Sequence, residues 1–365
     1  MKPGPAVSAW SPEVSTGSDR ISFAEILADP ETKARWAKVR RYNFLRESTY
    51  DMTNRCDLRC EGCYYYQGDK QHFRENRSPD DWRRLFQQEK ARGITFVVLA
   101  GAEPALVPEL LEVCHQEIEL GCIATNGFKR IPDQVGYRIH VSVWGDDETS
   151  YRLRKAKNLL ARQMDNYGGD SRAVFVYTFT RDNVREAAGV VETLARSDCL
   201  ITFNVFSAPV GYQGPLKHTA QSLAAARDTM LELMAAHPRQ VLFSHYNAVV
   251  HTHPLGLHDL FSCPYPRRNP STDLGLGRTF RQYRTDLNWD RSAACCVPDT
   301  DCRDCRHYAS GSAVVTAKLF RHAASPNAFR SWLDYVDNYL AVWVTGYEKG
   351  YNLCPTLIQP PPPSD

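Results

Sequence analysis

Residues 55–66 read RCDLRCEGCYYY, which places three cysteines within eight positions and three tyrosines directly after them. Three residues separate Cys56 from Cys60, and two separate Cys60 from Cys63. Three unrelated core thiols are a poor explanation for this spacing, because metal and iron–sulfur sites draw on such short cysteine runs. A closed site needs four ligands, however, and this loop supplies three.

Three interpretations of the loop are open from its residues. A structural zinc site would need a distant fourth ligand, and a ferredoxin-like cluster would need a fourth cysteine. In the third interpretation, the three cysteines hold three irons of a four-iron cluster. The fourth iron is then left open, so that the amine and carboxylate of a substrate can chelate it.

The sequence around the loop predicts an α/β fold. From about residue 48 to 206, short apolar segments alternate with helical patterns, as buried parallel strands and their crossover helices do. The predicted strands are residues 48–53, 95–100, 122–126, 139–144, 174–180 and 200–205. The predicted helices are residues 79–92, 108–120, 148–166, 182–197 and 219–236. Ser78 and Asp81 form a capping box at the first of these helices.

Six β-α repeats favour a parallel sheet curled into a partial (β/α)6 TIM-like barrel, followed by a C-terminal cysteine-containing extension. On such sheets, the loops after the carboxyl ends of the strands carry the functional site. The cysteine loop follows the first strand, GAEP (101–104) the second and TNG (125–127) the third. We therefore expect all three loops at one rim of the barrel.

Composition divides the chain into five segments. Residues 1–20 and 359–365 are rich in proline, serine and glycine, and we expect both to be disordered. Residues 21–47 are expected to form a helical lead-in, 48–237 the partial barrel, and 238–358 the extension.

The net charge of +2 makes nucleic acid an improbable partner. Because no secretory signal and no long apolar run occur, we expect a cytoplasmic protein that does not enter a membrane.

The C-x3-C-x2-C spacing directly after the first strand resembles the radical S-adenosylmethionine (radical SAM) superfamily. The resemblance covers residues 48–206 and implies a 4Fe–4S cluster on Cys56, Cys60 and Cys63, with S-adenosylmethionine (SAM) on the open iron. It also implies that one electron cleaves SAM to methionine and a 5′-deoxyadenosyl radical, which then attacks the substrate. An electron donor such as flavodoxin or ferredoxin is implied as a partner.

Further positions resemble the SAM-binding motifs of this family. GAEP resembles its GGEP motif, in which small residues let the backbone approach a ligand, and TNG resembles the turn after the third strand. Ordinary turn and cap chemistry is the alternative for Ser142 and Thr180. The family often has an aromatic residue just before the third cysteine, where this chain has Gly62 and then, after Cys63, Tyr64. The predicted cofactor-binding residues are Tyr64, Gly101, Ala102, Glu103, Asn126, Ser142 and Thr180.

The extension carries a second group of cysteines. Cys263, Cys296, Cys302 and Cys305 are candidate ligands of an auxiliary iron–sulfur cluster, which radical SAM enzymes often append. A zinc site, and buried or free thiols, are the alternatives. Upstream of them, HTHP (251–254) predicts two histidines on one face of a short strand.

The segment 151–162, YRLRKAKNLLAR, is strongly basic. We interpret it as the solvated face of a helix. Contact between an anionic substrate and Arg152 or Arg154 is the alternative, because both arginines are expected near the rim.

The substrate is predicted by exclusion. No N-terminal peptide-recognition domain is evident, so we expect this radical SAM enzyme to act on a small polar metabolite, such as a sugar, nucleoside or amino acid. Modification of a peptide or an RNA is the alternative within the family. A zinc-stabilised binding protein, with two structural cysteine sites, is the alternative from another class.

Overall fold

The fold is built on one parallel sheet. The computed structural model describes residues 22–42, 45–67, 74–75, 78–254, 281–289, 304–306 and 325–347. Within them, seven strands pair in the order β6-β5-β4-β3-β2-β1-β7, and every pairing is parallel. The strands are β1 (Glu47–Asp51), β2 (Phe96–Ala100), β3 (Gly121–Thr125), β4 (Arg138–Val143), β5 (Ala173–Phe179), β6 (Ile201–Val205) and β7 (Gln282–Tyr283). Because β6 and β7 stand at opposite ends of this order, the sheet is open.

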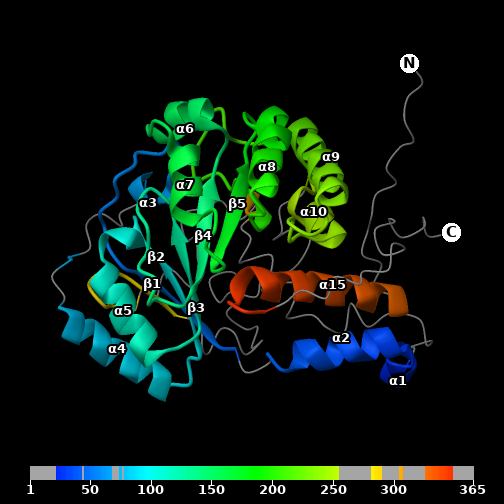
Figure 1. The fold of residues 1–365 in the computed structure, drawn as a ribbon, viewed down its shortest axis with the longest axis horizontal. Helices are drawn as coiled ribbons and strands as arrows, with labels where there is room; N and C mark the ends of the chain where they lie inside the picture. The colour runs from blue at the N-terminus through cyan, green and yellow to red at the C-terminus, as the bar shows by residue number, and fades with distance from the viewer. Residues whose placement is uncertain are drawn as a thin grey trace.

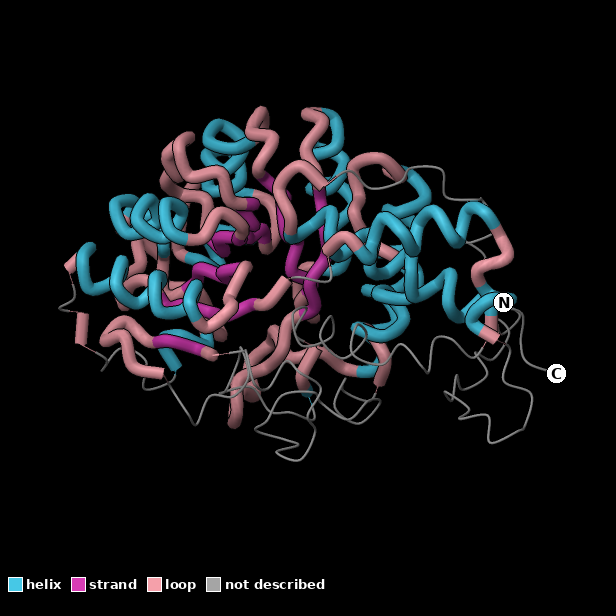
Figure 2. Tube along the Cα trace, turned by 90° about the horizontal axis from the view of Figure 1, so that it is seen from below, coloured by secondary structure: helices cyan, strands magenta, loops and turns pink. Residues whose placement is uncertain are grey.

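Helices follow the strands and surround the sheet (Figures 1 and 2). Those of the β-α repeats are α4 (Pro79–Ala91), α5 (Pro108–Glu117), α6 (Asp147–Arg154), α7 (Leu159–Tyr167), α8 (Ala187–Arg196) and α9 (Ala220–Ala236). Shorter elements are α3 (Tyr64–Gln67), α10 (His245–His251) and the 3-10 turns η2 (Pro104–Leu106) and η3 (Val184–Glu186). At the other side of the molecule, α1 (Phe23–Ile26) and α2 (Pro30–Arg40) lie against α15 (Pro326–Trp343). No helix in the described ranges is long and apolar enough to cross a membrane.

The six strands predicted from the sequence are all present, each within two residues of its expected ends. The capping box is also confirmed, since Ser78 and Asp81 each bind the backbone N–H of the other. The seventh strand, β7, was not expected because it has two residues, too few for a pattern. It forms parallel bridges to Thr49 and Tyr50 of β1.

The predicted single helix over residues 148–166 is wrong. The structure has two helices there, α6 and α7, separated by residues 155–158. Lys155 and Asn158 adopt left-handed backbone conformations, with φ of 59° and 52°. A left-handed residue ends an α-helix, so α6 stops at Arg154. The chain then turns over the cysteine loop before α7 begins.

The two faces of the sheet differ in character. Strand register places alternate residues on one face. The outer face is apolar, buried and covered by helices, as expected for a β-α fold. Its residues include Tyr50, Leu99, Ile123, Ile139, Val141, Phe175, Tyr177, Ile201 and Phe203. The inner face carries polar side chains, which are Thr49, Asp51, His140, Ser142, Thr178, Thr202, Asn204 and Gln282.

The C-terminal end of α15 docks at the start of β4. Arg138, the first residue of β4, donates from Nη2 to the carbonyls of Ala341 (2.8 Å) and Val344 (3.2 Å). Nε2 of His140 lies 2.8 Å from the carbonyl of Val342. A guanidinium group at the C-terminus of a helix binds carbonyls that lack a partner in the helix and complements the helix dipole. These contacts fix α15 below the inner face.

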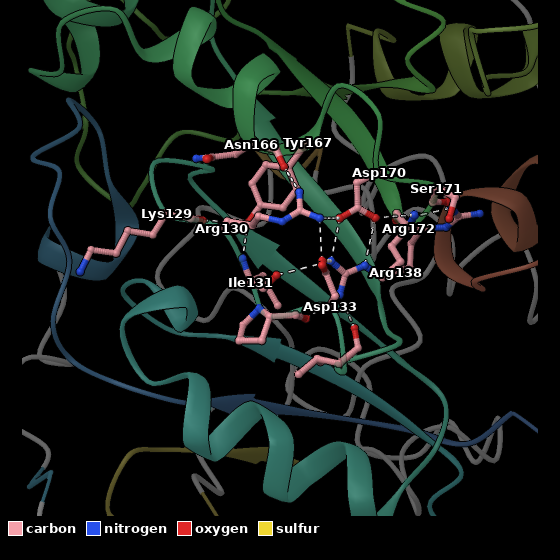
Figure 3. A network of polar contacts seen from close by, with 12 residues as sticks. Lys129, Arg130, Ile131, Asp133, Arg138, Asn166, Tyr167, Asp170, Ser171 and Arg172 are labelled. Carbon is pink, nitrogen blue, oxygen red and sulfur yellow. Dashed lines mark hydrogen bonds and ion pairs between the residues drawn. The ribbon is translucent and has the colours of Figure 1, made fainter.

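A polar network braces this lower end of the sheet (Figure 3). Arg172 forms an ion pair with Asp170 at 2.6 Å, and a longer one with Asp133 at 3.2 Å. It also donates to the carbonyls of Pro132 and Val135. The network therefore ties the segment that enters β4 to the turn that enters β5. It stiffens the end of the sheet opposite the cysteine loop.

Candidate functional site

The cysteine loop follows β1, as predicted, and leads into the short helix α3. Its thiols are half-buried. Arg59 donates to the carbonyls of Cys56 (2.9 Å) and Leu58 (2.8 Å), which curls the loop around one guanidinium group. Further on, the backbone N–H of Glu61 donates to the carbonyl of Leu153 at 2.8 Å. The loop is thus held both by its own side chain and by the end of α6.

Three N–H groups point at the sulfur atoms. The backbone N–H of Leu58 lies 3.4 Å from Cys56 Sγ, and Nδ2 of Asn126 lies 3.7 Å from the same sulfur. Nε of Arg154 lies 3.4 Å from Cys60 Sγ. N–H donors around cysteine ligands are one of the means by which proteins set the reduction potential of iron–sulfur clusters.

Glu103 joins the two neighbouring loops at the rim. Its Oε1 accepts hydrogen bonds from the N–H of Ala105 (2.9 Å) and the hydroxyl of Thr125 (2.6 Å). Its Oε2 accepts from the N–H of Asn126 at 2.7 Å. Burial raises the pKa of Glu103 to about 7, although these donors act in the opposite direction. The GAEP and TNG loops are therefore brought together through one buried carboxyl group.

Gly101 lies tightly against the strand that leads to the cysteines. Its φ is +119°, and a Cβ there would stand 2.9 Å from the N of Met52 and 3.0 Å from the O of Thr53. The next residue, Ala102, donates its N–H to that same Thr53 carbonyl at 2.9 Å. Only glycine fits such an approach of two backbones. The added methyl of Ala102 is accommodated one position later.

A residue that the sequence did not indicate completes the rim. Nε2 of Gln163, buried on α7, donates to the carbonyls of Asn126 (2.7 Å) and Ser142 (2.8 Å). The carbonyl of Ser142 also accepts from Nη1 of Arg154. Asn126 in turn donates to Asp57 at 2.6 Å. The segments after β1, β3 and β4 thus form one hydrogen-bonded unit, to which Glu103 joins the GAEP loop. The cysteine, GAEP and TNG loops therefore lie at one rim, as predicted.

Comparison with known families agrees with this geometry. Residues 50–186, which run from β1 to η3, match the family model of the radical SAM superfamily. These residues form a radical SAM domain. The sequence-based identification of a radical SAM domain is therefore confirmed.

Two radical SAM relatives are similar over part of their length. The chain is 26% identical to the sporulation killing factor maturation protein SkfB of Bacillus subtilis, over 42% of this chain and 40% of SkfB. Crystal structures of Streptococcus suis SuiB match with TM-scores of 0.51 (bound to its precursor peptide SuiA, 15% identity) and 0.50 (bound to SAM, 16% identity). Each match covers 73% of this chain and 64% of SuiB. The chain thus spans about two fifths of SkfB, and the likeness to SuiB confirms the predicted partial-barrel fold.

The cysteine loop of this radical SAM core fits the cluster that the family implies. Burial raises the pKa of Cys56 to about 11 and also raises that of Cys63, so both thiols need a bound cation to become thiolates. Among the described residues, no three His, Cys, Asp or Glu side chains converge on one ion. The cysteines of a four-iron cluster each bind a different iron, so they need not converge. When bound, the cluster supplies the electron that cleaves SAM.

Of the predicted SAM-binding residues Thr180 and Tyr64, the structure describes the side chain of Thr180 only. Thr180 is fully buried and forms a turn, because its N–H donates to Asn183 Oδ1 (2.7 Å) and its hydroxyl accepts from the N–H of Asp182 (3.3 Å). The side chain of Tyr64, the first residue of α3, lies outside the described part of the chain. For both residues, SAM binding stays a prediction.

The candidate auxiliary-cluster residues Cys263, Cys296 and Cys302 also lie outside the described residues. Cys305 is half-buried, and the N–H of its neighbour Arg306 donates to Ser207 at 2.8 Å, just after β6. This short segment therefore lies beside the rim.

The predicted strand carrying two histidines is wrong. His251 is the last residue of α10, and His253 follows in the turn after it. Nδ1 of His251 lies 3.0 Å from the carbonyl of Arg306, whose guanidinium donates to the carbonyl of His253 at 2.5 Å. Two alternating residues alone do not distinguish a strand from the end of a helix.

Proposed function

We propose that this radical SAM enzyme modifies a peptide. Two observations on relatives support the proposal. SkfB, at 26% identity, is a maturation protein, and SuiB, at 15% identity, has been crystallised with a precursor peptide. They favour the alternative of a peptide substrate over the small polar metabolite that the sequence alone suggested.

The inner face of the sheet supplies the observation that carries the proposal. Asp51 Oδ2 and Arg284 Nη1 form a buried ion pair 2.7 Å long at the rim end of β1. Asn204 Oδ1 on β6 and Thr285 Oγ1 after β7 are buried and have no hydrogen-bond partner among the described residues. Buried polar atoms are normally satisfied. A peptide backbone carries repeated N–H donors and C=O acceptors. Its N–H groups match the acceptor oxygens of Asp51 on β1, Asn204 on β6 and Thr285 after β7, and its C=O groups match the hydroxyl of Thr285 and the guanidinium of Arg284.

The residues that hold the cofactors are part of the proposal. Cys56, Cys60 and Cys63 bind the 4Fe–4S cluster. The rim loops bind SAM, with the backbone of the GAEP loop close to the methionine moiety and the β3 and β4 ends beside it. The SAM-binding residues are Gly101, Ala102, Glu103, Asn126 and Ser142, with Tyr64 and Thr180 as further candidates.

A substrate-dependence assay tests the function. The enzyme is reconstituted without oxygen and given SAM and a chemical reductant. One sample then receives synthetic peptides encoded by short reading frames beside the gene, and another receives the small-molecule fraction of a cell extract. We expect peptide alone to raise the release of 5′-deoxyadenosine and to change in mass. Stimulation by the small-molecule fraction alone overturns the proposal.

Matched variants keep the assay specific. Cys60→Ala removes one cluster ligand and abolishes release in both samples. Asp51→Asn keeps the size of the side chain but removes the charge that faces Arg284. We expect it to weaken peptide stimulation while the slow uncoupled cleavage of SAM continues, because the cysteines and rim loops are unchanged.

An auxiliary cluster is proposed on the cysteines of the extension, and iron counting tests it. Cys302→Ala/Cys305→Ala should lower the iron content from about eight to about four atoms per chain. About four in both proteins excludes the second cluster. The half-buried thiol of Cys305, close to the end of β6, supports the proposal.

A further inference from the structure

Four exposed basic side chains stand around the cysteine loop on its outer side. Arg59 lies within the loop, Lys155 and Lys157 lie in the turn between α6 and α7, and Arg162 lies on α7. We call these four residues the loop-side basic surface. They come from two segments almost a hundred residues apart, the cysteine loop and the α6–α7 region, whose turn the sequence pattern concealed. Figure 1 shows α3, which follows the cysteine loop, and the helices α6 and α7.

An apolar cluster holds the two segments together. Leu58, Ala156 and Leu159 are buried against one another, and Cys56, Cys60 and Phe128 pack on them. Ala156 therefore anchors the turn on the cysteine loop, while its two lysine neighbours are exposed. The guanidinium of Arg162 lies over the Phe128 ring, 4.3 Å from its centroid. The charged side chains thus lie around a group of apolar residues that contacts Cys56 and Cys60, two of the three cysteines proposed to bind the iron–sulfur cluster.

Among the described residues, no acidic side chain forms an ion pair with these four cations. Arg59 binds backbone carbonyls, Lys155 donates to the carbonyl of Arg152 at 2.7 Å, and Lys157 lies over the Tyr151 ring. Some exposed arginines elsewhere form ion pairs, as Arg84–Asp81, Arg130–Asp133 and Arg196–Glu192 show.

Two carboxylates, Asp57 and Glu61, lie in the cysteine loop beside this surface. Asp57 accepts from Asn126, and Glu61 accepts from Tyr212 at 3.1 Å. Hydrogen bonds from an amide and a phenol leave both carboxylates charged, but neither forms an ion pair with the four cations. Four positive and two negative side chains leave an excess of two positive charges here, as much as the net charge of +2 of the whole chain. A field of this kind attracts a partner of opposite sign.

We propose that the loop-side basic surface docks an acidic protein that carries one electron. The reaction requires an electron at the cluster from outside the chain, and this face brings a partner next to Cys56 and Cys60. The reduced donor loses one electron and the cluster gains it, passing from the 2+ to the 1+ state without transfer of an atom. Charge attraction speeds the encounter, and the apolar cluster provides the contact through which the cofactors come close.

Reduction of the cluster without any peptide or SAM tests the docking surface separately from the proposed function. Lys155→Glu/Lys157→Glu reverses two charges of the surface, and the control Lys33→Glu/Lys90→Glu reverses two exposed lysines of α2 and α4. Both proteins carry the same net charge. Rapid mixing with a reduced flavodoxin, at low and at high salt, gives the reduction rate from the loss of the visible absorbance of the cluster. Photoreduced deazariboflavin, which is small and lacks net negative charge, serves as the second reductant.

We expect the Lys155→Glu/Lys157→Glu protein to be reduced by flavodoxin about tenfold more slowly at low salt, with a weaker salt dependence. The control should change less than about twofold, and the small reductant should act alike on all three proteins. Equal slowing by the control, or no slowing, overturns the proposal. Equal slowing with the small reductant also overturns it, because the lysines would then act on the cluster itself. If the reversal instead weakens only binding of the precursor peptide, the surface belongs to the substrate and the proposal is wrong.

Discussion

A Cβ atom on Gly62 would stand 2.8 Å from Cζ of Phe206, which lies directly after β6. The φ of Gly62 is +65°, a left-handed conformation that favours glycine. The Phe206 ring also meets Trp144 and Tyr212 edge-on, at centroid distances of 6.0 and 5.7 Å. The sequence showed that an aromatic residue is missing just before the third cysteine. In the structure, Phe206, directly after β6, packs against this position.

Gly62→Ala is expected to damage the cysteine loop. The new methyl must displace Phe206, and the left-handed backbone adds strain, so we expect a loss of about 2–3 kcal/mol in the free energy of unfolding. Iron bound after reconstitution should fall as well. In Gly62→Ala/Phe206→Leu the clash is relieved while the backbone strain stays, so part of the loss should be recovered. Gly189→Ala on α8, where nothing lies within 4 Å of the new methyl, is the control and should not destabilise.

Arg154 is expected to raise the midpoint reduction potential of the iron–sulfur cluster. Its buried guanidinium donates to Cys60 Sγ and to the carbonyl of Ser142, and it lies over the Trp144 ring at 5.7 Å. A cation and an N–H donor beside a thiolate stabilise the more negative, reduced cluster. Arg154→Gln should therefore lower the midpoint potential, by about 60 mV if the reduction equilibrium changes tenfold. Redox titration followed by electron paramagnetic resonance measures the shift. Arg152→Gln, on the same helix but exposed, should leave the potential unchanged.

Glu103→Gln is expected to weaken the hydrogen bonds that hold the GAEP and TNG loops together. The carboxylate accepts three hydrogen bonds with two oxygens, whereas an amide has one oxygen and would turn its NH2 toward a donor. We expect a cost of about 1–3 kcal/mol and weaker SAM binding, measured by calorimetry on the reconstituted enzyme. Glu109→Gln, an exposed residue of α5, is the matched control. Unchanged SAM affinity in Glu103→Gln would show that the link between the two loops does not shape the site.

The sequence predicted those parts of the fold and site that rest on local pattern. Six strands were evident because each is a short apolar run, and the three cysteines because of their spacing. The break after Arg154 was hidden, since Leu153, Ala156 and Leu159 keep a spacing of three residues across it. Contacts between distant segments left no pattern in the sequence. Arg154 meets Cys60 across 94 positions, and Gln163 joins the turn at Asn126 to Ser142 of β4 across 37 and 21 positions.

Arg138→Met is expected to release α15. Methionine keeps the apolar stem of the side chain but leaves the carbonyls of Ala341 and Val344 without their charged donor. We expect a loss of about 2–4 kcal/mol in unfolding free energy. Hydrogen exchange should accelerate over residues 326–347 but not in α4. Arg130→Met removes an exposed arginine of the same network (Figure 3) and should cost less than about 1 kcal/mol. Equal effects of the two variants would contradict the docking role of Arg138.

His140 is expected to make the fold sensitive to acid. Burial lowers the pKa of His140 from 6.5 to about 4. Neighbouring Arg138 makes a smaller contribution in the same direction, whereas the hydrogen bond to the carbonyl of Val342 raises the pKa. Between these two values the unfolded chain binds a proton at this site and the folded chain does not. The contribution of a neutral His140 to stability is therefore complete above pH 6.5 and is lost as the pH falls toward about 4.

The variant His140→Gln isolates this effect, because its amide can donate to Val342 and does not titrate. Burial also lowers the pKa values of His218 and His251 to about 4, but these two residues are common to both proteins and cancel in the difference. Between about pH 7.5 and about pH 5, wild type should lose about 2 kcal/mol more unfolding free energy than the variant. Urea unfolding at the two pH values, in the absence of oxygen, measures the difference. Parallel losses in the two proteins would mean that protonation of His140 is not coupled to the docking of α15 on β4.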